Sequence, residues 1–203
     1  MKSAVVGFRV HSGWTSLVVV ALEKGKPIVL VRQRPHLVET FSYVFRQPYH
    51  TAQKMSLGEA EEFLERQRKE ARVLAGKALR AVQQDVAQQR YKLKRAVLLT
   101  ASGRPLPELA KILAAHSLIH TADGEFFREA ILRGCEKARI TVELRKERDL
   151  VTSASLLLKR KPAALLTRVT ELGKPVGAPW SQDEKFATLA AWVTLCPGQN
   201  HKH

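Results

Sequence analysis

The segment AVVGFRVHSGWTSLVVVALEKGKPIVLVRQR, residues 4–34, decides the fold. It contains three runs rich in Val, Leu and Ile, and two turn signals, His11-Ser12-Gly13 and Glu23-Lys24-Gly25-Lys26, separate them. Short turns of this kind connect neighbouring antiparallel strands. The segment therefore predicts a three-stranded antiparallel meander over residues 4–10, 15–22 and 27–34.

The next part of the chain predicts a long helix followed by a buried strand. Residues 35–55 carry two prolines and several aromatics, which is typical of a packed loop. Ser56 and Glu59 have capping-box spacing, and apolar residues at helical spacing follow them. The run Ala96-Val97-Leu98-Leu99 within residues 95–101 has the continuous apolar character of a strand in a parallel sheet.

The remaining elements alternate between helix and strand. Pro107 suits the first turn of a short helix that ends near His116. Apolar spacing and capping signals then predict the following order: a helix over 125–138, a strand over 140–144, helices over 152–158 and 163–172, and a last helix opened by a second capping box at Ser181 and Glu184.

This order of elements resembles the ribonuclease H-like superfamily. Gly7 in the first strand, the turn before the second strand and the Ala-rich last helix are most similar to RuvC-type resolvases. The resemblance implies an α/β fold with a mixed five-stranded sheet, three antiparallel strands followed by two parallel ones, and helices on both faces. We expect residues 1–196 to form a single domain and residues 197–203 a polar tail. Another α/β layer protein with a mixed sheet is the alternative.

The resemblance also implies acidic residues at three places, the ends of strands one and four and the last helix, where two divalent metals need anionic oxygens. At the first place the sequence reads Gly7-Phe8-Arg9, and a guanidinium cannot bind a cation. At the second there is no acid between Arg95 and Pro107. At the third, helix capping explains Asp183 and Glu184. We therefore expect no metal, no cofactor and no two-metal nuclease.

The composition points to an anionic partner. Lys and Arg number 34 against 19 Asp and Glu, so the formal net charge is +15. Such a surface repels cationic ligands and attracts polyanions such as nucleic acid, ribosomes, nucleotides or an anionic membrane surface. Of these, nucleic acid is the partner we expect. A hydrophobic content of 45% excludes global disorder.

The two cysteines, Cys135 and Cys196, form no CxxC pair, which argues against a disulfide scaffold or a zinc ribbon. The first long apolar run spans only residues 17–22, whereas a membrane span needs roughly 20 residues. These features predict a cytoplasmic protein that does not interact with membranes.

A site is expected where the parallel strands end. The residues predicted to converge there are Arg9, His11, Arg104, His116, His120, Asp123 and Glu125. One hypothesis is an anion site formed by Arg9, His11, Arg104 and the helix start near Thr121. A second is a metal or acid–base site that uses His120, Asp123 and Glu125, with His120 and Glu125 as the catalytic candidates. In a third, Thr121 or Asp123 only caps the helix.

The densest basic stretch lies in the C-terminal half of the chain. It is the candidate surface for nucleic-acid phosphates, and its members are Arg145, Lys146, Arg148, Lys159, Arg160 and Lys161. The segment Arg46-Gln47-Pro48-Tyr49-His50 could stack on a base, although a packed loop explains it better.

Three functions remain open on the sequence. The first is a polyanion-binding, nucleic-acid-binding domain that lacks the nuclease site. The second is an enzyme acting on a small anionic or phosphorylated substrate at the end of the sheet. The third is a structural subunit, either a homodimer or bound to a partner protein, for which an apolar patch around Trp14 or Trp180 would be expected.

Overall fold

The structure is a computed structural model that describes residues 1–101 and 105–196. The strands are β1 (Lys2–His11), β2 (Trp14–Glu23), β3 (Lys26–Gln33), β4 (Tyr91–Thr100) and β5 (Thr141–Lys146). The α-helices are α1 (Tyr43–Arg46), α2 (Pro48–Ala52), α3 (Leu57–Gln88), α4 (Leu109–Leu113), α5 (His116–Lys137), α6 (Leu150–Leu158), α7 (Pro162–Leu172) and α8 (Gln182–Leu195). Two 3₁₀ turns, η1 (Glu147–Asp149) and η2 (Lys174–Val176), complete the described elements.

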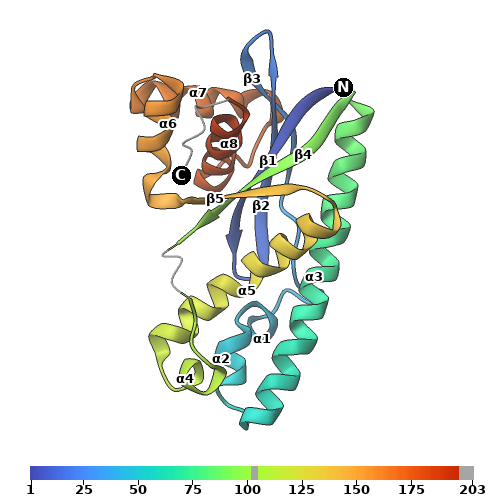
Figure 1. Cartoon of the computed structure of the whole chain (residues 1–203), viewed down its shortest axis with the longest axis vertical. Coiled ribbons are helices and arrows are strands. Elements are labelled where there is room, and N and C mark those ends of the chain that lie inside the picture. Colours follow the sequence, from blue (N-terminus) through green and yellow to red (C-terminus); the bar gives the residue numbers. More distant parts are fainter. Residues whose placement is uncertain (102–104, 197–203) are drawn as a thin grey trace.

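The five strands form one sheet in the order β3-β2-β1-β4-β5 (Figure 1). The pairs β1–β2 and β2–β3 are antiparallel, as the meander predicts. The pairs β1–β4 and β4–β5 are parallel, which confirms the prediction that strands one, four and five lie side by side. The carboxyl ends of β1, β4 and β5 therefore meet along one edge of the sheet.

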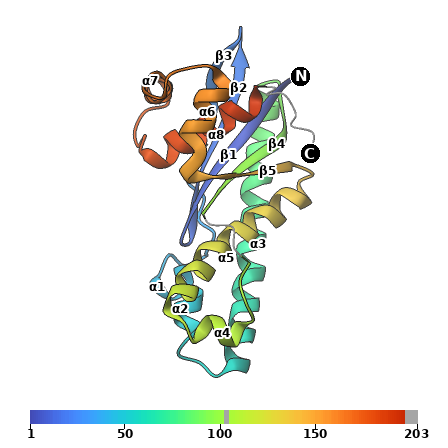
Figure 2. The same ribbon diagram turned by 60° about the vertical axis from the view of Figure 1, so that its left-hand side comes forward.

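Side chains of β1 point alternately to the two faces of the sheet, and each face packs against its own layer of the core. Ala4, Val6 and Phe8 pack into the layer formed with α3 and α5. Val5 packs into the opposite layer, which α6, α7 and α8 cover. Figure 2 shows these two groups of helices on opposite sides of the sheet. Because side chains alternate along a strand, Gly7 and Arg9 share the α8 side with Val5.

Gly7 permits a close approach of α8 to the sheet. A Cβ atom at this position would lie 2.0 Å from the carbonyl oxygen of Ala187 in α8. Only glycine fits here, and its absence of a side chain sets the distance between the last helix and β1. This contact brings the start of α8 beside the end of β1.

Part of the helical layer extends beyond the sheet. The 32 residues of α3 make it about 48 Å long. Its first half, together with α1, α2, α4 and the start of α5, forms a helical lobe past the carboxyl ends of β1 and β4 (Figure 1). Within this lobe, residues 43–52 fold into α1 and α2, so the prediction of a loop over 35–55 is wrong there. None of the described helices is long and apolar enough to cross a membrane.

Both predicted capping boxes are confirmed, at Ser56 with Glu59 and at Ser181 with Glu184. The prediction of a helix start near Glu125 is wrong, because α5 already begins at His116. Packing explains the difference: Ile119 and Ala122 are fully buried and stabilise the first turns of α5 against the lobe. Pro107 lies outside α4, whose N-cap residue is Glu108.

Candidate functional site at the sheet edge

Arg9 lies at the carboxyl end of β1 and is held by two carboxylates. Its Nε donates to Glu147 over 3.0 Å and its second amino nitrogen donates to the other oxygen of Glu147 over 2.6 Å. Its remaining amino group donates to Asp183. Glu147 follows β5 directly, and Asp183 lies in the first turn of α8. The Arg9 guanidinium thus links β1 to the turn after β5 and to the start of α8, three segments that are far apart in the sequence.

Asp183 receives a second hydrogen-bond partner from β1. His11 Nε2 lies 2.8 Å from the same carboxylate oxygen that Arg9 contacts. Burial acts to raise the pKa of Asp183, but the hydrogen bond from Arg9 and the interactions with His11 outweigh it and lower that pKa. The bidentate bond to Glu147 raises the pKa of Arg9 despite partial burial. Asp183 and Arg9 are therefore both charged at neutral pH.

A second ion pair lies beside the first. Arg34 Nε donates to Glu184 over 2.5 Å, and its amino group donates to Ser181 over 3.0 Å. The side chain of Glu184 is fully buried. Burial opposes its ionisation, but the bonds from Arg34 and Ser181 lower its pKa to about 2. Glu184 thus completes the capping box and also neutralises Arg34.

Aromatic rings cover the two arginines. Trp14 stacks on His11 with ring centroids 4.4 Å apart, and the Arg34 guanidinium lies 4.9 Å from the Trp14 ring. The Arg9 guanidinium lies 5.7 Å from the Phe186 ring. Each guanidinium therefore lies near the face of one aromatic ring, which is a favourable cation–π arrangement.

This arrangement does not fit the pair of divalent metals that the resemblance implies. Two metals need several free carboxylate oxygens, whereas Arg9 donates to both Glu147 and Asp183. The end of β4 supplies Thr100 and Ala101, which carry no carboxylate. The guanidinium occupies the position between the acids where a cation would bind.

An open cleft of about 630 Å³ adjoins the ion pairs. Its lining residues come from the ends of β4 and β5 and from α5, α6 and α8: Thr100, Ala101, Arg128, Glu147, Arg148, Val151 and Phe186. Arg148 is exposed, whereas Arg128 donates to Glu125 over 2.8 Å. The buried Nε of Arg128 has no hydrogen-bond partner among the described residues. The cleft therefore combines the exposed cation of Arg148 with the Glu147 carboxylate and the apolar side chains of Val151 and Phe186.

The structure divides the residues that were predicted to converge. Arg9 and His11 lie at the edge, but their partners are carboxylates. Arg104 lies outside the described residues. The prediction of a helix start at Thr121 is wrong, because Thr121 lies inside α5 and its hydroxyl donates to the carbonyl of Ser117. No amide of that turn is free for an anion.

The predicted pair of catalytic candidates is also separated. His120 lies 3.0 Å from His116 between their Nε2 atoms, and Glu125 pairs with Arg128. Asp123 is buried and accepts hydrogen bonds from Tyr49 and His50. Among the described residues no hydrogen bond joins His120 to Glu125, so the structure shows no acid–base pair there.

The six basic candidates fall at the two ends of α6. Arg145, Lys146 and Arg148 lie before it, and Lys159, Arg160 and Lys161 follow it. The nine residues of α6 separate the two groups by about 13 Å. All are exposed except Arg145, which is bonded to Glu143 and Ser153.

The structural hypothesis expects an exposed apolar patch around Trp14 or Trp180, and in the part of the chain that the structure describes the one apolar ring linked to Trp14 that is exposed is Phe41, which stacks on His36 beside it. Trp14 and Trp180 are half-buried, and the indole N–H of Trp180 donates to the carbonyl of Val169 over 3.0 Å. Among the described residues, the exposed leucines lie at the start of α3 and on β5, α6 and α7: Leu57, Leu144, Leu156, Leu157 and Leu166.

Three important residues were missed from the sequence: Glu147, Arg34 and His50. Glu147 could have been found, because it lies three residues after the predicted parallel strand over 140–144 and such positions meet at the sheet edge. Arg34 ends the third predicted strand, and nothing in the local sequence indicates Glu184 as its partner. His50 was noted only as a member of a basic–aromatic loop.

Neither a protein family nor a curated protein matches the sequence. Solved structures do match it. The structure of RuvC from Thermus thermophilus has a TM-score of 0.51 at 12% sequence identity, over 94% of this chain and 92% of that one. The same RuvC in complex with a Holliday junction substrate has a TM-score of 0.52 at 14% identity, over 94% and 91% of the two chains. The chain therefore has the ribonuclease H-like fold seen in RuvC.

Proposed function

We propose that this protein binds nucleic acid, with four-way DNA junctions as the preferred form, and does not cleave it. One observation carries the proposal: Arg9 lies between Glu147 and Asp183, in the place where a nuclease of this fold needs a metal. A protein that has the fold without the metal ligands retains a shape suited to DNA but lacks the means to activate water.

Charge supports the binding part of the proposal. The formal net charge is +15, although the ion pairs at the sheet edge neutralise Arg9 and Arg34 internally. The excess positive charge must therefore come from other side chains. The exposed groups at the two ends of α6 and Arg148 at the cleft are the best candidates for phosphate contacts.

The fold supports the preference for junctions. RuvC from T. thermophilus, which shares the fold, has been solved with a Holliday junction substrate. The exposed cations before and after α6, together with Arg148 at the cleft, would contact more than one duplex arm. A branched molecule offers more phosphates to such a surface than a single linear duplex does.

The test is a titration of labelled four-way junction and of a linear duplex of equal length, followed by fluorescence anisotropy at several salt concentrations. We expect submicromolar affinity for the junction at low salt, weaker binding to the duplex, and a steep loss of affinity as salt rises. Affinity no better than millimolar for both molecules would contradict binding.

The second half of the test is incubation of the junction with Mg²⁺ or Mn²⁺. We expect intact strands on a denaturing gel. Strand cleavage that EDTA abolishes, and that the variant Glu147→Gln also abolishes, would show that the edge is a working nuclease site.

A further inference from the structure

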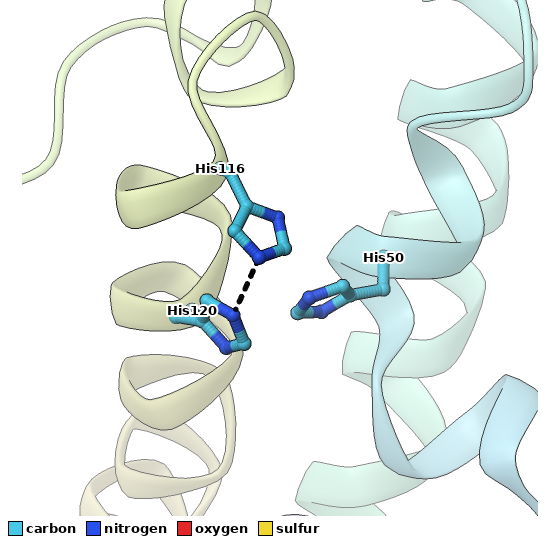
Figure 3. Close-up of side chains that lie close together, drawn as sticks. All are labelled: His50, His116 and His120. Carbon is cyan, nitrogen blue, oxygen red and sulfur yellow. Dashed lines mark hydrogen bonds between the residues drawn. The ribbon is translucent and has the colours of Figure 1, made fainter.

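Three histidines of the helical lobe come together outside the sheet edge. His116 and His120 lie one turn apart on α5, with their Nε2 atoms 3.0 Å apart. The ring of His50, on α2, points toward both of them (Figure 3). Its centroid lies 4.5 Å from that of His120 and 5.5 Å from that of His116. One nitrogen from each ring lies within 4.8 Å of the others.

These separations are close to those of a metal site. Three imidazole nitrogens around a tetrahedral Zn²⁺, each at about 2.0–2.1 Å, lie about 3.3 Å from one another. The Nε2 atoms of His116 and His120 are 3.0 Å apart, and all three ligand nitrogens lie within 4.8 Å of one another. His116 and His120 are exposed, so small rotations of their side chains can bring the three nitrogens to equal spacing.

A buried carboxylate orients the third ring. Asp123 is only 4% exposed, and its Oδ2 lies 2.5 Å from His50 Nδ1. Its other oxygen accepts the backbone N–H of Tyr49 over 2.7 Å, which fixes the carboxylate. Nδ1 of His50 therefore donates to Asp123, and the lone pair of Nε2 remains free. Metal-binding histidines have this second partner in most proteins.

We propose that His50, His116 and His120 bind one divalent transition-metal ion, with Zn²⁺ as the expected occupant, and that Asp123 is the positioning residue. Imidazole ligands favour Zn²⁺, Co²⁺, Ni²⁺ or Cu²⁺ over Mg²⁺ or Ca²⁺, which prefer oxygen. Water completes the coordination, because the two α5 ligands face solvent. The ion ties α2 to the first turns of α5.

This site is independent of the nucleic-acid proposal. Its ligands belong to α2 and α5, and among the described residues no ion pair or hydrogen bond joins them to Arg9, Glu147 or Asp183. Loss of junction binding would leave the metal proposal unaffected, and loss of metal binding would leave the junction proposal unaffected.

The experiment is calorimetric titration of the full chain, without an affinity tag and freed of metal, with Zn²⁺. We expect one ion per chain at micromolar affinity or tighter. The double variant His116→Gln/His120→Gln should lose at least 100-fold in affinity, and Asp123→Asn should lose about 10–100-fold. Co²⁺ should give the intense visible absorption of a tetrahedral site in the wild type and not in the double variant.

Two control variants locate the ion. His36 stacks on Phe41, away from the cluster, so His36→Ala should retain full affinity. His201 and His203 are the last histidines of the sequence, and their replacement by Ala should also retain it. Equal affinity in the wild type and the double variant, or loss of the ion on removal of His201 and His203, would overturn the proposal.

A thermal melt keeps the test decisive if Asp123→Asn does not fold. His116 and His120 are exposed, so their Gln variant should melt as the apo wild type does. A 100-fold excess of Zn²⁺ over its Kd should raise the Tm of the wild type by roughly 5–10 °C and leave the double variant unchanged. An equal rise in both proteins would contradict the proposed ligands.

Discussion

The sheet edge and the helical lobe each contain a cluster of polar side chains. At the edge these side chains are paired with one another, whereas in the lobe part of their hydrogen-bonding capacity is left free. At the edge, Arg9 and His11 donate to the oxygens of Glu147 and Asp183. In the lobe, Asp123 accepts from one nitrogen of His50 and leaves the other free to face His116 and His120. We infer from this comparison that an ion binds where side-chain lone pairs are left without a hydrogen-bond donor, which the number of acids alone does not indicate.

The two regions also differ in their links to the fold. The edge cluster joins β1, the turn after β5 and the start of α8, so it connects two of the three parallel strands to the last helix. The histidine cluster joins only α2 to α5. We therefore expect substitutions at the edge to affect stability and substitutions in the lobe to affect metal binding.

The largest effect is expected from Arg9→Asp, which removes the cation that pairs with Glu147 and Asp183 and adds a third carboxylate. Three carboxylates then lie together without the Arg9 guanidinium, and only His11 and Arg34 remain beside Asp183. The free energy of unfolding should therefore fall by about 3 kcal/mol at neutral pH. Millimolar Mg²⁺ or Mn²⁺ should restore part of it, measured by urea unfolding with and without metal. Arg148→Asp, at an exposed position, is the control and should show neither change. An Arg9→Asp protein as stable as the wild type would contradict the claim that Arg9 stabilises the sheet edge.

The next effect is expected from Arg34→Ala, which leaves Glu184 buried without its cation. Arg34 is partly exposed and water can replace some of its contacts, so we expect a loss of about 2 kcal/mol at pH 7. Chemical denaturation of both proteins measures it.

The same pair predicts a pH dependence. The pKa of Glu184 falls from 4.5 to about 2 on folding. The stability that ionised Glu184 provides is therefore complete above pH 4.5 and is lost as the pH falls toward 2. The difference between wild type and Arg34→Ala should shrink between pH 6 and pH 3. A difference that grows over this range would contradict the account of the pair.

A smaller effect is expected from cations that have no carboxylate partner. Lys159, Arg160 and Lys161 are exposed at the turn between α6 and α7. Their joint replacement by Glu should weaken junction binding about 10-fold or more at low salt and make its salt dependence shallower. The matched control is replacement of Arg66, Lys69 and Lys77 by Glu on α3, which packs on the opposite face of the sheet. An equal loss from both triple variants would mean that net charge alone drives binding.

The smallest effect is expected from Glu125→Gln. Glu125 and Arg128 form an i,i+3 pair on α5, and such pairs contribute about 0.5 kcal/mol or less. Stability should change by that amount, and junction binding should change by less than twofold. A larger loss of binding would show that Glu125 takes part in junction binding.

The topology could be predicted from the sequence because its signals are local. The two short turns, the apolar run of residues 96–99 and the capping boxes at Ser56 and Ser181 each depend on neighbouring residues, and the structure confirms them. The arginine at position 9, where the resemblance implies an acid, was equally visible. Its pairing with Glu147 was not, because that contact spans 138 positions of the chain.

The start of α5 shows why the site was harder to predict. Asp123-Gly124 has the composition of a helix start, but Asp123 instead accepts from Tyr49 and His50 inside a continuous helix. Burial against α2 outweighs the local preference. Because the helix was predicted to start near Glu125, His120 was placed at the sheet edge. Its position in the lobe, close to His50, was therefore not predicted.

The most direct test of the comparison is a crystal structure of the protein soaked in parallel with Mn²⁺ and with Zn²⁺, with anomalous scattering measured for each metal. The account predicts a zinc peak among His50, His116 and His120, and no manganese peak between Glu147 and Asp183, where the Arg9 guanidinium remains. A manganese ion bound by these two carboxylates, with Arg9 displaced toward solvent, would contradict it.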